Sequence, residues 1–251
     1  MNYRIVSLVP SLTAFMVAIG LSDHLVGISD FCAAPPGNEP PRIGGSRNPD
    51  LSAIAALAPD HILATRQECS AAELQALAPN CMISLLDIRC VADVAPQLTT
   101  LAAQFGAADR ASQLGNQIAA AQATAVAAMA GRPPRRVLAF SSREPWIAIG
   151  GESYAADLLG VCGGLNIAER LGPRMPRAGL DVFMQYNPQV ILLAGRPDPF
   201  SITDQARFRR FGDVAAVLAR RIHICDGTLL FEYGFRTAEA IRNISSLIWR
   251  T

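Results

Sequence analysis

Short apolar runs alternate with helical segments along the first part of the chain. The run at residues 5–9 predicts a buried strand. Pro10 ends this strand, and Ser11 stands at the N-cap position of an apolar helix over residues 12–21. The same alternation predicts strands over residues 25–29, 61–65, 82–86 and 136–140, and helices over residues 51–58, 71–77 and 91–105. This order is typical of parallel sheets built from strand–helix–strand units.

The middle of the chain carries one long helical pattern, rich in Ala and Gln, over residues 108–130. At about 1.5 Å per residue it would span on the order of 35 Å. A surface helix would also fit, but a connector is favoured because the strand–helix alternation restarts directly afterwards. The predicted fold class is therefore α/β, with two lobes that each hold a small parallel sheet flanked by helices. One long connecting α-helix joins them, which gives an N-terminal lobe at 1–107, the connector at 108–131 and a C-terminal lobe at 132–251.

Composition narrows the classes of protein that fit. Hydrophobic residues make up 51% of the 251 residues and charged residues 17%, so a substantial core is expected and disorder is not. The net charge of +1 argues against nucleic acid as a partner. No leader pattern precedes the first strand, and the six cysteines are scattered as buried thiols would be. The sequence as it stands predicts a cytoplasmic protein, or a periplasmic one if a leader precedes Met1.

Several loops fall where a ligand would bind, because open parallel sheets bind ligands beyond the carboxyl ends of their strands. The turn after the first strand and the Pro- and Gly-rich loop over residues 30–50 are the first two. Later come the ends of two further strands and the loop over residues 231–236. The candidate ligand-binding residues are Pro10, Ser11, Thr13, Phe31, Cys32, Gly45, Ser46, Arg66, Arg143, Trp146, Phe231, Tyr233 and Arg236.

These candidates suggest aromatic walls with a few polar anchors. Phe31 offers a flat apolar face and Cys32 a soft donor, although both could simply pack the loop down. Arg66 and Arg143 could clamp carboxylate or phosphate groups, although exposed arginines are usually only solvated. Trp146 is favoured as a cleft wall over a core residue, because its neighbours are polar and turn-like.

Metal and catalytic signatures are weak. Only three histidines occur, His24, His61 and His223, and none matches a ligand position in these loops, so a bare metal ion and an intrinsic cofactor are not expected. No nucleophile elbow, Walker loop or zinc-protease motif occurs. The chain is therefore predicted not to be an enzyme.

Four stretches carry a resemblance to a known family. They are residues 5–13 (IVSLVPSLT), 41–50 (PRIGGSRNPD), 57–60 (LAPD) ahead of a strand, and 143–146 (REPW). In this order, with a long helix between lobes, they resemble the helical-backbone (class III) substrate-binding proteins, also known as helical-backbone metal receptors. This group includes the cobalamin-binding and iron-siderophore-binding components of ABC importers.

The resemblance implies a protein that binds a bulky metal chelate in a cleft between the lobes, most simply cobalamin or another corrinoid. A ferric siderophore or haem is an alternative. A second alternative is an intracellular corrinoid carrier or enzyme that reuses the receptor fold, since Ala14 stands where the family usually carries Glu. The resemblance also implies docking to an ABC transporter permease through Glu68 or Glu73 and through Asp204 or Asp213. A monomer is expected.

Overall fold

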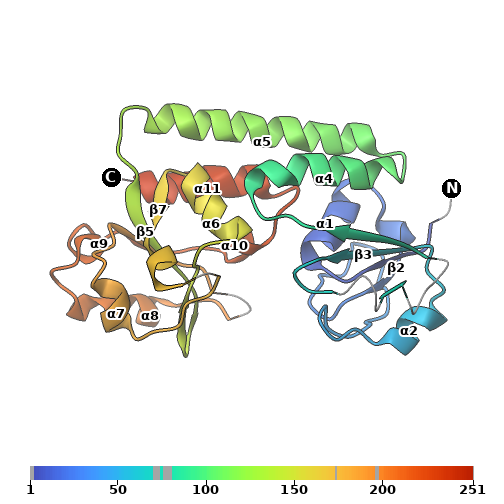
Figure 1. The fold of residues 1–251 in the computed structure, drawn as a ribbon, viewed down its shortest axis with the longest axis horizontal. Helices are drawn as coiled ribbons and strands as arrows, with labels where there is room; N and C mark the ends of the chain where they lie inside the picture. The colour runs from blue at the N-terminus through green and yellow to red at the C-terminus, as the bar shows by residue number, and fades with distance from the viewer. Residues whose placement is uncertain (1–2, 70–73, 76–80, 173, 196–197, 251) are drawn as a thin grey trace. The chain divides into compact units, whose positions relative to one another are not determined.

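The computed structural model describes residues 3–69, 74–75, 81–172, 174–195 and 198–250 (Figure 1). The chain divides into two compact units. The first unit comprises Met1–Ile88 and Ala92–Gly115, and the second comprises Arg89–Val91 and Asn116–Thr251.

The first unit is built on a parallel four-stranded sheet. Its strands follow the order β2-β1-β3-β4. They are β1 (Ile5–Ser7), β2 (Leu25–Ile28), β3 (His61–Thr65) and β4 (Met82–Leu86). All four strands were expected from the apolar runs. Residues 5–6 and 62–64 are fully buried, as the central strands of such a sheet should be.

The helices of the first unit begin close to the predicted residues. They are α1 (Pro10–Ala18), the 3₁₀ turn η1 (Ser22–His24), α2 (Leu51–Ala56) and most of α4 (Val91–Ala103). Asp50 caps α2 by accepting a hydrogen bond of 3.0 Å from the Ala53 N–H. The prediction of Ser11 as a cap is wrong, because α1 already begins at Pro10, whose fixed φ suits the first helical position. The helix predicted at 71–77 lies largely outside the described residues.

The second unit holds a five-stranded sheet that is parallel except for one strand. Its order is β6-β5-β8-β9, with β7 also paired to β5. The strands are β5 (Arg135–Arg143), β6 (Trp146–Ala148), β7 (Gly164–Asn166), β8 (Val190–Leu193) and β9 (Ile222–Ile224). β6 runs antiparallel to β5, while β7, β8 and β9 extend the sheet in parallel. The α/β fold class, with helices flanking largely parallel sheets, is confirmed.

Short helices connect these strands. They are α6 (Tyr154–Val161), η2 (Ile167–Leu171), α7 (Leu180–Met184), α8 (Ile202–Ala206), η3 (Arg207–Arg210), α9 (Ala215–Leu218), α10 (Thr228–Phe231) and α11 (Thr237–Trp249). Ser153 caps α6 by accepting a hydrogen bond of 3.2 Å from the Ala156 N–H. Ser201 and Asp204 form a capping box at the start of α8, which satisfies two backbone donors there.

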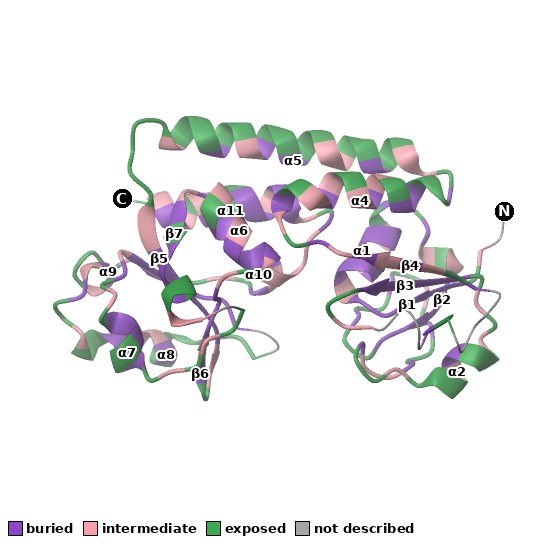
Figure 2. Cartoon of the chain, viewed as in Figure 1, coloured by how far each residue is buried: buried purple, intermediate pink, exposed green. Residues whose placement is uncertain are grey.

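The predicted long helix is present as α5 (Ala108–Met129). Its buried positions are Ala111, Ile118, Ala121 and Ala125, so only a narrow stripe of mostly small residues is covered (Figure 2). The chain passes from the first unit to the second within α5, after Gly115. The division into lobes at 1–107 and 132–251 stays a prediction. None of the helices in the described ranges combines the length and apolar character that crossing a membrane requires.

Aromatic rings form the centre of the second unit. The ring centroid of Phe140 lies 4.9 Å from that of Trp146, 5.0 Å from that of Phe183 and 6.0 Å from that of Phe208. Trp146 is only 7% exposed and belongs to this cluster. The expectation that Trp146 is a wall rather than a core residue is therefore wrong. The turn at Glu144-Pro145 folds β6 back along β5 and places the indole over Phe140.

None of the six cysteines, all of which lie in the described ranges, forms a disulfide. Cys32, Cys81 and Cys162 are buried. Burial raises the pKa of the Cys81 and Cys162 thiols to about 11. These thiols therefore stay protonated at neutral pH, in the form that reacts poorly with oxidants and electrophiles.

His61, at the start of β3, should make the folding stability of the protein depend on pH. It is buried among the rings of Tyr3 and Phe105, with centroids 5.7 and 4.7 Å away. Burial lowers the pKa of His61 even though Asp60 raises it, and burial also lowers the pKa of His223. The unfolded chain therefore takes up protons near its own pKa of about 6.5 before the folded chain does. We expect full stability above about pH 6.5 and a progressive loss as the pH falls through the lowered folded values.

Urea denaturation at a series of pH values would measure this loss. His61→Gln should reduce the slope of the free energy of unfolding against pH below about pH 6.5. The part of the slope that is due to His223 should remain. An unchanged slope in this variant would contradict the assignment to His61.

Candidate functional site

A buried polar cluster lies at the carboxyl edge of the first sheet, where β1 and β2 end. The Thr13 Oγ1 lies 2.8 Å from the Ser7 Oγ and 3.0 Å from the Cys32 Sγ. The Ser29 Oγ lies 3.1 Å from the same sulfur. All four side chains are buried, so Thr13 and Cys32 face one another and hold the loop after β2 against α1.

Arg42 completes this anchoring from the far end of the loop. Its Nη1 donates hydrogen bonds of 2.9 Å to the Ser29 carbonyl and 2.5 Å to the Cys32 carbonyl. Nothing in the sequence around Arg42 separates it from the exposed arginines, because the contact depends on how the Pro-rich loop folds back beside β2. The loop is thus fixed by internal hydrogen bonds before any ligand arrives.

Phe31 projects from this fixed loop and is 66% exposed. The Phe31 ring lies beside the Gly45 backbone, where an added Cβ would be at an ordinary contact distance of 3.4 Å. Among the neighbouring candidates, Pro10 is half-buried and Ser11 is buried. The first unit therefore presents one flat apolar surface next to a glycine turn.

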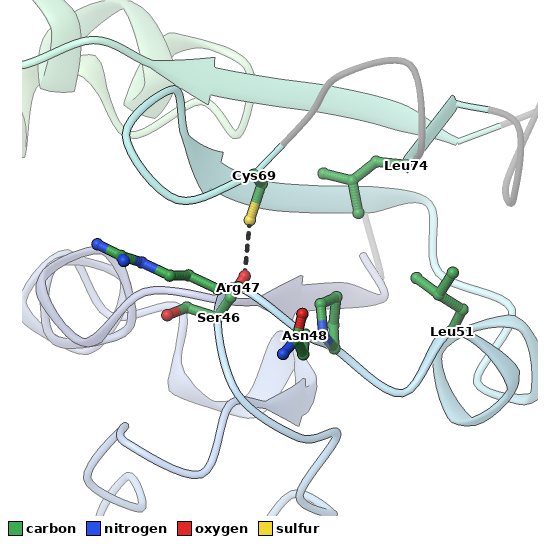
Figure 3. Close-up of a pocket in the computed structure, with 7 residues that line it drawn as sticks. Ser46, Arg47, Asn48, Leu51, Cys69 and Leu74 are labelled. Atoms are coloured by element: carbon green, nitrogen blue, oxygen red, sulfur yellow. Dashed lines mark hydrogen bonds between the residues drawn. The ribbon is translucent and has the colours of Figure 1, made fainter.

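A pocket of about 290 Å³ adjoins this turn (Figure 3). It is lined by Ser46, Arg47, Asn48, Pro49, Leu51, Cys69 and Leu74. The Cys69 thiol donates a hydrogen bond of 2.9 Å to the Ser46 carbonyl and pins the turn. The Arg47 guanidinium lies at one end of the view, and the Leu51 and Leu74 side chains lie at the other (Figure 3). The lining thus includes one cationic side chain beside polar and apolar ones.

Arg66 follows β3 at the same edge of the first sheet and is exposed. Its backbone N–H donates a hydrogen bond of 2.9 Å to the Leu86 carbonyl, which extends the pairing of β3 with β4 by one residue. Backbone pairing therefore orders the chain as far as Arg66, while the Arg66 side chain remains accessible to solvent.

In the second unit, Arg143 is the last residue of β5 and is already paired. Its Nε lies 3.4 Å from the Asp204 Oδ1, and its Nη1 donates a hydrogen bond of 3.1 Å to the Pro199 carbonyl. Burial alone would raise the pKa of Asp204, but hydrogen bonds from Ser201 and the charge of Arg143 hold it below its ordinary value. Asp204 is thus a structural carboxylate.

Arg236 is paired even more fully. Its Nε and Nη2 donate to the two Glu239 oxygens at 3.0 and 3.1 Å, a bidentate arrangement. Its Nη1 donates to the Thr228 Oγ1 at 2.6 Å and to the Asp226 Oδ2 at 3.2 Å. The hydrogen bonds from Arg236 hold the pKa of Glu239 below its ordinary value. The guanidinium therefore orders the segment before α11 and has little capacity left for an anion.

The remaining candidates of the second unit are less exposed than expected. Phe231 and Tyr233 are half-buried, and the Tyr233 ring packs edge-on against Tyr154 at 5.8 Å. The Tyr154 hydroxyl in turn lies 3.0 Å from the Thr237 Oγ1. Whether any of the candidate residues contacts a ligand stays a prediction.

The acidic residues expected to dock a permease differ in exposure. Asp213 is exposed and Glu68 is half-buried, whereas Asp204 is only 7% exposed and is engaged by Ser201 and Arg143. Glu73 lies outside the described residues. Asp213 is therefore better placed than Asp204 for an external contact.

Within the described ranges, no group of three His, Cys, Asp or Glu side chains is arranged to hold a metal ion. The residues at the carboxyl edges provide one exposed aromatic face, arginines and backbone turns. Aromatic faces with polar anchors are typical of sites for organic ligands.

Comparison with known proteins identifies the family. The sequence profile of the periplasmic binding protein family matches residues 5–226, which is most of the chain. The chain belongs to this family.

Relatives of this periplasmic binding protein include the vitamin B12-binding protein of Yersinia pestis (strain Pestoides F). The two sequences are 27% identical over 194 residues, which cover 76% of this chain and 69% of the relative. The family and this relative agree with the resemblance drawn from the sequence motifs.

Two solved structures share the fold. The crystal structure of the periplasmic vitamin B12 binding protein of Vibrio cholerae has a TM-score of 0.85 at 21% identity, covering 98% of this chain and 97% of that one. The apo form of the periplasmic heme-binding protein of Roseiflexus sp. RS-1 has a TM-score of 0.80 at 21% identity, covering 99% and 98%. At such identities the likeness concerns the fold, and the ligand of this chain has to be argued from its own residues.

Proposed function

We propose that this chain is a binding protein for a bulky metal chelate and that its ligand is a corrinoid of the cobalamin type. The observation that carries the proposal is the exposed ring of Phe31 over Gly45, beside the pocket at Ser46. A broad planar macrocycle needs such a flat apolar surface with a few polar anchors around it. The protein acts by binding and does not transform its ligand.

The paired arginines of the second unit favour a corrinoid over a ferric siderophore. Arg143 is paired with Asp204, and Arg236 is paired with Glu239 and Asp226, so carboxylates already balance both guanidinium charges. The periphery of a corrinoid carries mainly neutral amides, which need hydrogen-bond partners more than unpaired cations. Arg47 and Arg66, both exposed, can donate to such amide oxygens.

The pocket of the first unit would receive only part of this ligand. Its volume of about 290 Å³ is at the lower end for sites that enclose a whole small molecule. A side group of the macrocycle could enter it while the ring lies on Phe31. The cleft between lobes that the sequence suggests stays a prediction.

We further propose delivery to an ABC transporter permease and a periplasmic location, as the family's description suggests. Asp213 is the candidate docking acid of the second unit because it is exposed, and Glu68 is the candidate of the first. Charge reversal at Asp213 should lower cobalamin uptake in cells without changing cobalamin binding by the purified protein.

Titration with cyanocobalamin and aquocobalamin tests the proposal. Saturable changes in the corrin absorbance and a rise in melting temperature are expected at ligand concentrations on the order of tens of micromolar. Phe31→Ala should weaken cobalamin binding about tenfold, because the lost stacking is worth about 1–1.5 kcal/mol. The variant should keep the stability of the parent protein, since the ring is mostly in solvent.

The matched control is Leu218→Ala, which removes an exposed apolar side chain of α9, 70% accessible, away from the carboxyl edges. It should bind cobalamin as tightly as the parent. Absence of any change with either cobalamin would overturn the corrinoid assignment. Saturable binding of haemin or of a ferric catecholate in the same assay would then identify the ligand among the alternatives.

A further inference from the structure

A second pocket lies at the opposite, amino edge of the sheet in the second unit. Its volume is about 370 Å³. It is lined by Gln205, Ala219, Arg220, Arg221, Ile222, His223 and Arg250. These residues come from α8, from the turn between α9 and β9, from β9 itself and from the end of α11. We call it the amino-edge pocket.

The lining of the amino-edge pocket is strongly cationic. Arg220, Arg221 and Arg250 contribute three guanidinium groups, and no carboxylate is among the described residues that line it. The pKa of Arg135, at the start of β5, is lowered mainly by burial and to a smaller extent by the nearby charges of Arg221 and Arg132. The like charges at this edge therefore repel one another, and none of the described lining residues supplies an anion.

Two buried nitrogens here also lack partners. Neither the Nε2 of His223 nor the Nε of Arg221 makes a hydrogen bond with any described group. Burial and the charges of Arg250 and Arg221 lower the pKa of His223. A buried polar atom without a partner costs about 1–3 kcal/mol, so a water molecule or a ligand is expected to supply the partner that the protein does not.

The backbone conformation of Arg220 is also unusual for an arginine. This residue follows the C-terminal turn of α9 with a φ of 54°, in the left-handed region. Gly or Asn is the usual residue at such a position, because other side chains are strained there. The neighbouring Gln205 fixes the start of β9 by donating a hydrogen bond of 2.5 Å to the Ile222 carbonyl. Arginine is thus held at a position that local geometry alone would not favour.

We propose that the amino-edge pocket binds a phosphate group, either as inorganic phosphate or diphosphate or as the phosphate of a small phosphomonoester. Arginine guanidinium groups match phosphate oxygens in geometry as well as charge. A phosphate carries about −1.5 to −2 charges at pH 7, which balances several arginines better than one carboxylate does. The pocket is large and polar enough for a diphosphate or a monoester.

This inference does not depend on the proposed chelate. The amino-edge pocket lies at the ends of β5, β8 and β9 opposite to Arg143 and the segment around Arg236. Loss of phosphate binding should therefore leave cobalamin titrations unchanged, and the two proposals can fail separately.

Calorimetric titration at constant ionic strength, maintained with sodium chloride, provides the test. The probes are inorganic phosphate, diphosphate and glycerol 3-phosphate. Saturable binding is expected for at least one probe, with a dissociation constant on the order of a millimolar or lower. Tighter binding of diphosphate would indicate a free inorganic ligand, and tighter binding of glycerol 3-phosphate would indicate a phosphomonoester.

The chain has only three histidines, so their ring proton resonances can be followed individually. The His223 signals should shift saturably with the bound probe, while those of His24 and His61 should stay in place.

The informative variant is R220Q/R250Q, which removes two exposed guanidinium groups from the pocket. It should weaken phosphate binding at least tenfold. R170Q/R209Q is the control, because it removes the same charge from exposed positions of the same unit that do not line the pocket. Equal weakening in both variants, or no saturable binding by any probe up to the order of ten millimolar, would overturn the proposal.

Discussion

Replacing Phe140 with alanine should lower the free energy of unfolding of the second unit by about 3–5 kcal/mol. The side chain is fully buried, and its ring contacts those of Trp146, Phe183 and Phe208. Alanine would leave a cavity among side chains that belong to different elements and cannot close in together. A loss of this size removes a large part of the stability of an ordinary domain.

Tryptophan fluorescence during urea unfolding would measure this loss. Both tryptophans, Trp146 and Trp249, lie in the second unit, so the signal reports on that unit. Phe235→Ala is the control, since Phe235 is 39% exposed and should lose about 1 kcal/mol or less. Equal losses in the two variants would contradict the central role of Phe140.

Replacing Gly227 with alanine should cost about 1–3 kcal/mol, because the added methyl group would overlap the backbone. A Cβ at Gly227 would lie 2.7 Å from the carbonyl oxygens of both Ala194 and Gly195. Main-chain atoms directly after β8 cannot move aside as the tip of a flexible side chain could. This close contact also positions Asp226 and Thr228, the partners of Arg236, so the pairing of Arg236 should be disturbed as well.

Urea denaturation would measure this loss of stability. Gly212→Ala is the matched control, because a Cβ there meets no atom within 4 Å. It should change stability by no more than about 0.5 kcal/mol. If the Gly227→Ala protein were as stable as this control, the backbone at Gly227 would not be tightly packed against the Ala194 and Gly195 carbonyl oxygens.

The sequence predicted the strands well where local signals agreed. The strand at residues 61–65 follows Pro59-Asp60, which stops the preceding helix, and the apolar run has no competing helical period. The long α5 was equally visible, because Ala and Gln carry a helical pattern without interruption up to Gly131. Such features depend on neighbours along the chain.

The site was harder to predict because its state depends on contacts between distant residues. Arg143 is separated from Asp204 by 61 positions, and nothing near either residue indicates that they pair. Trp146 was misjudged for the same reason, since its burial requires β6 to fold back over Phe140. Phe31 and Arg66 are both exposed in the described structure, and for Phe31 the sequence left open that the ring packs into its loop.

The buried cysteines can serve as probes for the rate of local opening in each unit. Cys162 is fully buried in the second unit, and Cys32 and Cys81 are buried in the first. Because a thiol-specific reagent attacks only an exposed thiolate, each of these cysteines should become labelled at the rate at which its surroundings transiently open. Mass spectrometry of the labelled peptides would measure the labelling rate of each unit separately in one unmodified sample. A ligand that stabilises either unit should lower the labelling rate of the cysteines in that unit.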